Sequence, residues 1–343
     1  GSRTPEVDSG SLVALVVLAV ALAYVNGFHD ASNAVSTAIT TRTLRESTAL
    51  GVAATLNLLG GLLGAGLMAL GAGWSADLLQ LTPLANALGD TPDMLGLVLC
   101  AVALSTLAWS VLTWWMGMPT STWHTILGAV LGACWVVGAS IPWDATMQLI
   151  MLPLLIGPLV AVALSFLLMR GLLALGRTEL LRAGHLRFAQ TISAGAVAAG
   201  HGIHDIRIPM TLVAMAVWAG GLDPQAALSA AVPLSLALAA GTLMGGHRII
   251  RTLGRRLSDL STAQGLAAES STAIVLGVGV LGLNMPMSTS HTLASSVVGV
   301  GLGLGPRHLR WPVVARIVAV WLVTPVASAA AAAALTVLAL RLG

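Results

Sequence analysis

Residues 26–33 read Asn-Gly-Phe-His-Asp-Ala-Ser-Asn, and this stretch decides the fold. It follows the apolar run 12–25 and precedes the mostly apolar run 34–40. Polar and ionisable side chains inside a bilayer are costly and mark functional sites, so the stretch indicates a site within a membrane helix. Gly27 is predicted to break that helix, because glycine can leave helical dihedrals without steric strain.

Composition indicates a membrane protein whose chain crosses the bilayer several times. Of its 343 residues, 57% are apolar and 8% are charged, and the mean hydropathy is +0.91. A soluble domain of this length needs more charged residues to cover its surface, and apolar runs of about 20 residues match the thickness of a bilayer. The formal charge of +3 does not indicate nucleic acid, since the arginines gather in short loops beside apolar runs. The lipid bilayer is therefore an expected partner, and nucleic acid is not.

Ten apolar segments are predicted to be membrane helices. They are 12–41 (broken near Gly27), 49–72, 94–116, 122–139, 147–169, 188–218 (broken near Gly202), 226–246, 263–283, 289–304 and 313–338. The arginine-bearing loops then all lie on one side, which the positive-inside rule makes cytoplasmic, so both termini are expected outside. Segments 94–139 and 263–304 each form a helical hairpin, and the sequence leaves open whether their arms cross fully.

An internal repeat organises these segments. Gly-Phe-His-Asp at 27–30 returns as Gly-Ile-His-Asp at 202–205, and Met-Pro-Thr-Ser-Thr-Trp-His-Thr at 118–125 returns as Met-Pro-Met-Ser-Thr-Ser-His-Thr at 285–292. The predicted division is an N-terminal tail (1–11), transmembrane repeat 1 (12–169), a cytoplasmic linker (170–187) and transmembrane repeat 2 (188–343). The first copy starts outside and the second inside, so the fold is an all-α polytopic bundle of two inverted repeats, typical of secondary transporters.

Asp30 and Asp205 are the two acids placed deepest in the predicted spans. An isolated buried carboxylate is neutralised unless a cation or a donor is near, so each implies a cation, a proton or a basic partner. The alternative is a structural acid that caps a helix restarting after the break. Duplication of the acid favours the functional interpretation.

Both copies of Met-Pro-x-Ser-Thr-x-His-Thr follow one apolar arm and open another. Proline followed by Ser and Thr is typical of a helix N-terminus, whose free amides and hydroxyls bind anions such as phosphate or sulfate. Two such ends in opposite repeats are expected to meet at one point. The predicted anion ligands are Ser121, Thr122, Ser288 and Thr289. Thr125 and Thr292 are weaker candidates, because a Thr one turn into a helix often bonds to its own backbone.

Other ionisable side chains are candidates for proton transfer and anion contact. His29, His201 and His204 stand close to the motif aspartates, with His29 and His204 directly before them. A titrating imidazole beside a carboxylate can carry a proton, whereas a sodium site needs only oxygens. Arg207 either pairs with Asp205 or contacts the substrate anion. Glu269, near the start of a span, either faces water or takes part in coupling.

Several function classes are open at this point. The paired acids and helix ends favour a secondary active symporter of a tetrahedral oxyanion, working by alternating access around a midplane site. An intramembrane hydrolase would instead use Ser121 or Ser288 with His124 or His291. A passive anion channel is disfavoured by the buried acids. The chain has no nucleotide-binding Gly-x-x-x-x-Gly-Lys loop, so transport is expected to run on an ion gradient, with no cofactor besides a coupling cation, H⁺ or Na⁺.

The same residues resemble the signatures of the inorganic phosphate transporter (PiT) family of cation–phosphate symporters, nearest to its bacterial low-affinity members. The resemblance covers both repeats, through residues 26–35, 200–205 and the two Pro-x-Ser-Thr-x-His-Thr stretches. It implies a non-enzymatic importer of inorganic phosphate in a bacterial inner (plasma) membrane, with a homodimer left open. It also implies that Asp30, Asn33 and Asp205, with Asn26 beside them, serve the coupling cation and would be its metal ligands if the cation is sodium. The four Ser and Thr ligands would hold phosphate.

Two departures from the family pattern bear on the coupling ion. His29 and His204 stand where the family commonly has Asn, and Ile-Arg-Ile at 206–208 replaces a more polar sequence. Loss of the Asn oxygens favours proton coupling, or co-transport of a metal–phosphate complex, over sodium. Arg207 could also widen the anion preference, with sulfate as the nearest alternative substrate.

Overall fold

The structure is a computed structural model that describes residues 9–70, 81–88, 92–176, 182–219 and 222–342. Within these ranges the chain is helical and contains no strand. The elements are α1 (Ser9–Thr40), α2 (Glu46–Ala69), α3 (Leu81–Ala87), α4 (Pro92–Met116), α5 (Thr122–Val137), α6 (Trp143–Thr146), η1 (Met147–Met151), α7 (Leu152–Leu175), α8 (Ala183–Asp205), α9 (Arg207–Ala219), η2 (Pro224–Ala230), α10 (Ala231–Met244), α11 (His247–Arg251), η3 (Thr252–Arg256), α12 (Thr262–Leu276), η4 (Gly277–Gly282), α13 (Thr289–Leu304), η5 (Pro306–His308) and α14 (Trp311–Leu342). The predicted all-α class is confirmed.

Seven helices among the described residues are long and apolar enough to cross a membrane. They are Gly10–Thr40, Glu46–Ala69, Met94–Met116, Leu152–Leu175, Pro224–Met244, Thr262–Gly282 and Trp311–Arg341. α5 and α13, the second arms of the predicted hairpins, have 16 residues each. Each therefore rises only about 24 Å, which is less than the roughly 30 Å of a hydrocarbon core. Their N-terminal tips begin inside the bundle.

α1 is one continuous helix through Gly27, so the predicted break at this glycine is wrong. A Cβ atom at Gly27 would overlap the carbonyl oxygen of Leu238 on α10, and one at Gly241 would overlap the carbonyl oxygen of Tyr24 on α1. The two glycines let the backbones approach closely, as small residues commonly do between membrane helices. Gly27 thus serves helix contact and not a change of direction.

The second copy is interrupted between α8 and α9, at Ile206 rather than at the predicted Gly202. Pro209 lacks the N–H that would bond to the carbonyl oxygen of Asp205, and its ring would clash with that carbonyl in a continuous helix. Residue 34, at the matching place in α1, is alanine. The difference explains why one copy is interrupted and the other is not.

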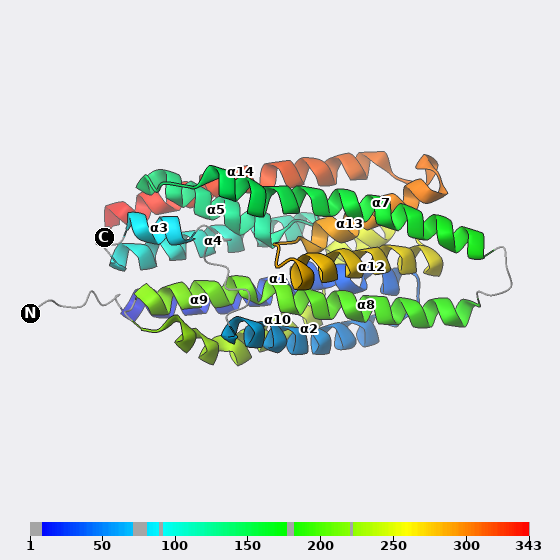
Figure 1. Ribbon diagram of the computed structural model, residues 1–343, viewed down its shortest axis with the longest axis horizontal. Coiled ribbons are helices and arrows are strands. Elements are labelled where there is room, and N and C mark those ends of the chain that lie inside the picture. Colours follow the sequence, from blue (N-terminus) through cyan, green and yellow to red (C-terminus); the bar gives the residue numbers. More distant parts are fainter. Residues whose placement is uncertain (1–8, 71–80, 89–91, 177–181, 220–221, 343) are drawn as a thin grey trace, which may run out of the picture.

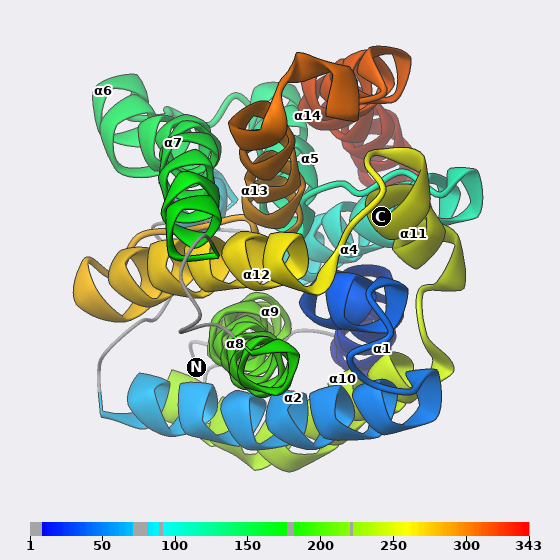
Figure 2. The ribbon, with the colours of Figure 1, turned by 90° about the vertical axis from the view of Figure 1, so that its right-hand side faces the viewer.

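Helix packing links the two predicted repeats. α1 packs against α10 and α2 against α8, so each of these pairs joins one helix from either repeat. α5 with α14 and α7 with α13 do the same. Gly202 meets the backbone of Asn57 on α2, which repeats the close approach made by Gly27. The end-on view in Figure 2 shows α1 and α8 lying between α2 and α12. The two halves are therefore interlocked.

The described ends of the chain lie together. α1 begins and α14 ends at one end of the bundle, while α7 ends and α8 begins at the other (Figure 1). This arrangement agrees with the prediction that the termini share one side, opposite the linker 170–187. Residues 177–181 of that linker lie outside the described part of the chain, and which face of the membrane each end occupies stays a prediction.

Candidate functional site

The short helices α5 and α13 begin where the two Pro-x-Ser-Thr motifs predict. Ser121 and Ser288 are the N-cap residues, and each Oγ accepts a hydrogen bond at 3.2 Å from the backbone N–H three residues later, that of His124 or His291. Because these serines bond to backbone amides, the geometry gives a capping role and no support to a serine hydrolase. The rings of the two histidines lie 4.5 Å apart, so the tips of α5 and α13 meet.

Asp30 on α1 joins these two tips. Its Oδ2 accepts a hydrogen bond from Thr122 Oγ1 at 3.0 Å, and its Oδ1 accepts one from Ser290 Oγ at 2.5 Å. His29 Nδ1 lies 2.9 Å from the same Oδ1. The side chain is buried. Sequence reasoning did not select Ser290, although it stands in the second motif between Thr289 and the histidine.

Asp205, at the end of α8, faces a different set of groups. Asn26 Nδ2 donates to its Oδ2 at 3.1 Å, and Trp123 Nε1 donates to its Oδ1 at 3.3 Å. His201 Nε2 lies 3.1 Å from Oδ2. Asn26 also accepts from Thr122 Oγ1 at 3.1 Å, so this amide bridges the two acid environments.

The two acids converge on one cluster with His201. One ligand atom from each of Asp30, His201 and Asp205 lies within 4.8 Å of the others, and all three residues are buried. The two acids and the imidazole are close enough for a single proton or cation to bind between them. These are the described residues that could hold a metal ion, and His201 is the third member of the set. The side chain of Asn33 lies outside the described residues.

The orientation of His201 follows from its neighbour on α2. Asn57 Nδ2 donates to Thr242 Oγ1 at 3.0 Å, which turns Asn57 Oδ1 toward His201 Nδ1 at 2.8 Å. His201 Nδ1 must then carry a hydrogen, and Nε2 of the neutral ring presents a lone pair to the Asp205 carboxylate. Two lone pairs 3.1 Å apart repel each other. Protonation of the ring at Nε2 turns this contact into a hydrogen-bonded ion pair.

The two histidines predicted for coupling have other described partners as well. His29 Nε2 lies 3.1 Å from Thr113 Oγ1 and 3.3 Å from Thr120 Oγ1. His204 stacks on Trp123 with ring centroids 4.6 Å apart, and its Nε2 lies 2.8 Å from the carbonyl oxygen of Met287. His29 thus contacts both Asp30 and the loop before α5, while His204 contacts the loop before α13.

Some hydroxyls of the predicted anion ligands form hydrogen bonds within the protein, and others have no described partner. Thr125 Oγ1 bonds back to the carbonyl oxygen of Ser121 at 2.8 Å, as expected for a Thr one turn into a helix. Thr122 is held by Asp30 and Asn26. The buried Oγ1 atoms of Thr289 and Thr292 have no hydrogen-bond partner in the described part of the chain. The tip of α13 therefore keeps donors for an anion, together with the free amides of its first turn.

Two further charged groups lie in the interior. Arg207 is 4% exposed, and its guanidinium carbon lies 6.0 Å from the centre of the Trp123 ring on α5. Glu269 on α12 is fully buried and accepts a hydrogen bond from Thr37 on α1. The alternative that Glu269 simply faces water is wrong, because α1 and α8 cover this part of α12.

Comparisons with known proteins agree with this arrangement. A model described as "Phosphate transporter family" matches residues 26–182 and 173–332. A Mycobacterium leprae protein named "Probable low-affinity inorganic phosphate transporter" is 32% identical over 322 residues, which cover 91% of this chain and 74% of the relative. A Bacillus subtilis protein with the same name is 26% identical over 319 residues, covering 91% and 92%. A solved structure titled "The sodium-dependent phosphate transporter" has the same fold, with a TM-score of 0.77 at 19% identity, over 97% of this chain and 99% of that one.

Proposed function

This chain belongs to the phosphate transporter family, and we propose that it imports inorganic phosphate as a secondary active symporter. The observation that carries the proposal is the meeting of the α5 and α13 tips at Asp30. A helix N-terminus with free amides and hydroxyls suits a phosphate oxygen. Phosphate would sit at the α13 tip, on the unused hydroxyls of Thr289 and Thr292. Arg207 and the cap serines are the further candidates for contacts with phosphate oxygens.

The coupling ion in this proposal is a proton. The cluster of Asp30, His201 and Asp205 includes an imidazole nitrogen, and sodium prefers oxygen ligands alone. The contact of His201 Nε2 with Asp205 is an ion pair only when the imidazole is protonated, so it is a place where a proton can be taken up and released. A metal–phosphate complex is the second option, because mixed nitrogen and carboxylate donors also suit a divalent transition metal.

Alternating access would move two inverted repeats, 12–169 and 188–343, around this site. The matched helix pairs α1 with α10 and α8 with α2 support a repeat relationship, as do the two short helices that meet tip to tip. The linker 170–187 and the other arginine-bearing loops would be cytoplasmic, with both termini outside and the chain in a bacterial inner membrane. No covalent chemistry is needed, since binding and release perform the work.

Uptake of labelled phosphate into proteoliposomes tests the proposal. A proton gradient alone is expected to drive accumulation, a sodium gradient alone is expected to have no effect, and excess sulfate is expected to leave uptake unchanged. Uptake driven by sodium alone would overturn the proton assignment. Uptake abolished by sulfate but not by unlabelled phosphate would overturn the substrate assignment. Uptake insensitive to every gradient would indicate a passive channel.

A further inference from the structure

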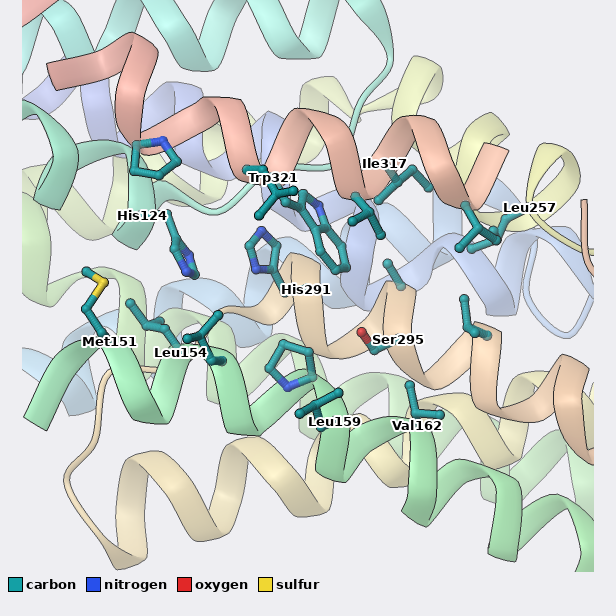
Figure 3. A pocket seen from close by; sticks show the side chains of 18 residues that line it. His124, Met151, Leu154, Leu159, Val162, Leu257, His291, Ser295, Ile317 and Trp321 are labelled. Atoms are coloured by element: carbon teal, nitrogen blue, oxygen red, sulfur yellow. The ribbon is translucent and has the colours of Figure 1, made fainter. Parts of the chain in front are cut away.

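Cavities in the described part of the chain differ sharply in their lining. A cavity of about 430 Å³ between α5, α7, α13 and α14 is lined almost entirely by apolar side chains (Figure 3). A smaller cavity of about 270 Å³ lies between the end of α4 and the segment α11–η3. Most of the surface lining it is polar, and the lining residues are Met116, Gly117, Arg248, Arg251 and Arg256. Among the described residues, three arginines and no acid line this arginine pocket, which therefore attracts an anion.

The acids near the arginine pocket do not neutralise its charge. Between residues 247 and 261 the one acid is Asp259, and it pairs with Arg310 at 2.9 Å. Glu46, at the start of α2, lies 2.7 Å from His247. None of the three pocket arginines has a salt bridge with another described residue. Since arginine stays protonated in proteins, the pocket keeps three positive charges for an anion from outside the chain.

Hydrogen bonds hold the arginine segment against the end of α4. Arg248 Nη1 donates to the carbonyl oxygen of Trp115 at 3.0 Å, and its guanidinium carbon lies 5.9 Å from the centre of the Trp114 ring. Thr252 Oγ1 donates to the carbonyl oxygen of Gly117 at 2.7 Å. Gly117 has a φ of +69°, and a Cβ atom there would lie 3.3 Å from the carbonyl oxygen of Arg248. Glycine at this turn therefore permits the close approach that forms the pocket.

The arginine pocket lies where two apolar helices end. Met94–Met116 and Pro224–Met244 are both long and apolar enough to cross a membrane, and the pocket residues follow directly after them or lie at their end. α11 contacts α4, and Figure 2 shows the two helices beside each other. The pocket is therefore placed at the level of lipid headgroups. This end is predicted to be cytoplasmic, and anionic lipids of the cytoplasmic leaflet attract arginines.

An exposed apolar stripe on α4 leads to the pocket. Leu104, Ala108, Val111 and Trp115 are exposed, and each is three or four residues from the next, so they share one face of the helix. Such a face meets lipid in a helix that crosses a membrane. Trp115 is 61% exposed and precedes Met116, which lines the pocket. An apolar chain lying on this stripe would thus reach the arginines at its end.

We propose that the arginine pocket binds the phosphate group of an anionic phospholipid, such as phosphatidylglycerol, with an acyl chain along the stripe on α4. Guanidinium groups bind phosphate oxygens through paired hydrogen bonds, and one phosphodiester offers oxygens to more than one arginine. Inorganic phosphate carries the same kind of group, but it has no part that would contact the apolar stripe. The two surfaces together therefore favour the lipid.

A bound lipid would stabilise the turn that leads into α5. Arg248 and Thr252 bond to the carbonyl oxygens of Trp115 and Gly117, and Gly117 stands two residues before Pro119 of the first Pro-x-Ser-Thr motif. A lipid held by the arginine segment would thus limit the motion of this turn. The inference rests on the placement of the chain in a membrane and not on the identity of the transported substrate.

Native mass spectrometry of the full chain, released from detergent micelles, tests the proposal. Phosphatidylglycerol is titrated, and the dissociation constant of the first bound lipid is compared with that of phosphatidylcholine, whose phosphate is balanced by choline. Phosphatidylglycerol is expected to bind about tenfold or more tightly, because its net negative charge is not balanced within the headgroup. Inorganic phosphate at millimolar concentration is expected to leave phosphatidylglycerol binding unchanged.

Variants of the pocket test its arginines. The triple variant Arg248→Gln, Arg251→Gln and Arg256→Gln should weaken phosphatidylglycerol binding on the order of 100-fold, with roughly fivefold from each arginine. The double variant Arg251→Gln with Arg256→Gln keeps the described bonds between α11–η3 and the end of α4, and it should weaken binding roughly 25-fold. Its loss of binding therefore does not depend on an altered turn.

The matched control changes three exposed arginines in other loops, Arg182→Gln, Arg187→Gln and Arg307→Gln. It removes the same net charge and should change phosphatidylglycerol binding less than about twofold, because these side chains do not line the pocket. Equal weakening by the control and the triple variant would mean that the lipid follows overall charge, which would overturn the proposed site.

Other outcomes would also overturn the proposal. Equal affinity for phosphatidylglycerol and phosphatidylcholine would mean that negative charge is not required. Displacement of phosphatidylglycerol by inorganic phosphate, or loss of calorimetric phosphate binding in the triple variant without lipid, would mean that free phosphate occupies the pocket. Lipid binding is the readout, so its failure leaves the phosphate uptake proposal standing. Failure of phosphate uptake with lipid binding intact would have the opposite meaning.

Discussion

Asp30 and Asp205 occupy matching positions in the two copies of one motif, yet their surroundings differ. Asp30 accepts hydrogen bonds from two hydroxyls, Thr122 on the α5 tip and Ser290 on the α13 tip. Asp205 has no hydroxyl among its described partners, which are Asn26, Trp123 and His201. Asp30 thus contacts both helix tips through hydroxyls, and the described partners of Asp205 contact it through nitrogen atoms.

The contrast arises from one difference between the two copies of the Met-Pro motif. Trp123 stands in the first motif where Ser290 stands in the second, and each donates to the acid of the other copy. The geometry is retained while the donor changes from hydroxyl to indole. The two motif threonines differ in the same way. Thr122 donates a hydrogen bond to Asp30, whereas the hydroxyl of Thr289 has no partner among the described residues. Substitutions at the acids, the contact glycines, the tip threonines and Pro209 test this contrast.

Neutralising the acids is expected to have the largest effect. Asp30→Asn and Asp205→Asn should each lower gradient-driven phosphate accumulation on the order of 100-fold or more. Each substitution removes one partner of a buried pair, Asp30 with His29 or Asp205 with His201, and leaves the protonated histidine without its carboxylate. Asp30→Asn replaces one acceptor oxygen by an amide nitrogen and so frees the hydroxyl of either Thr122 or Ser290 for phosphate, which should leave phosphate affinity unchanged or higher. Calorimetric titration and proteoliposome uptake measure the two quantities.

The exposed pair of Asp259 with Arg310 supplies a control for the loss of one carboxylate. Asp259→Asn should transport like the unaltered chain. If either buried-acid variant accumulates phosphate normally, that acid takes no part in coupling and the contrast between the halves is structural only.

Close helix contacts in the two halves should respond alike. Gly27→Ala and Gly202→Ala each place a methyl group against a backbone carbonyl of the facing helix, which should lower the free energy of unfolding by about 1–3 kcal/mol. Gly51→Ala and Gly66→Ala on α2 have nothing within 4 Å of the new methyl group and should stabilise the helix by up to about 1 kcal/mol. Thermal melting in detergent measures both. A loss in one half only would show that the two helix pairs are not equivalent.

The threonines at the two tips should separate phosphate binding from coupling. Thr289→Val removes an unused donor and should weaken phosphate binding about tenfold, the effect of one hydrogen bond to a charged group. Thr122→Val removes a donor to Asp30 and should alter the proton dependence of uptake more than phosphate affinity. Thr125→Val, whose hydroxyl bonds only to its own helix backbone in the described contacts, is the control. Equal loss of phosphate affinity at positions 122 and 289 would contradict the division.

The interruption after α8 is expected to matter least for transport. Pro209→Ala supplies an N–H for the carbonyl of Asp205 and should extend α8 into α9, with uptake changed less than about twofold because proline is tolerated in a first helical turn. Hydrogen exchange of the peptide around Ile206 should slow. Unchanged exchange would mean that packing, and not the proline, sets the interruption.

Much of the fold follows from local sequence. The starts of α5 and α13 are predicted correctly because the residues that cap a helix are adjacent in the chain. The role of Gly27 is not predicted, since a glycine that permits a bend and one that permits close contact look the same until the facing helix is known. The interruption at Ile206 had a signal in Pro209, which outweighs the more flexible Gly202.

The candidate site divides in the same way. Convergence of Asp30 and Asp205 follows from the repeat, because equivalent positions in two related halves approach their common axis. Trp123 and Ser290 could not be found, since each bonds to an acid in the other half. The orientation of the His201 ring depends on its hydrogen bond with Asn57, a residue of α2 that belongs to no sequence motif.

The interlocked packing sets the order in which this chain can be completed. α1 is synthesised first, but the α10 backbone that lies against Gly27 and the Ser290 hydroxyl that binds Asp30 are made only with the second half. Until the second half is made, Gly27 lacks its facing helix and Asp30 lacks one of its hydrogen-bond donors. A chain that ends before α13 therefore keeps the packing of α10 against Gly27 but lacks the Ser290 hydroxyl that binds Asp30.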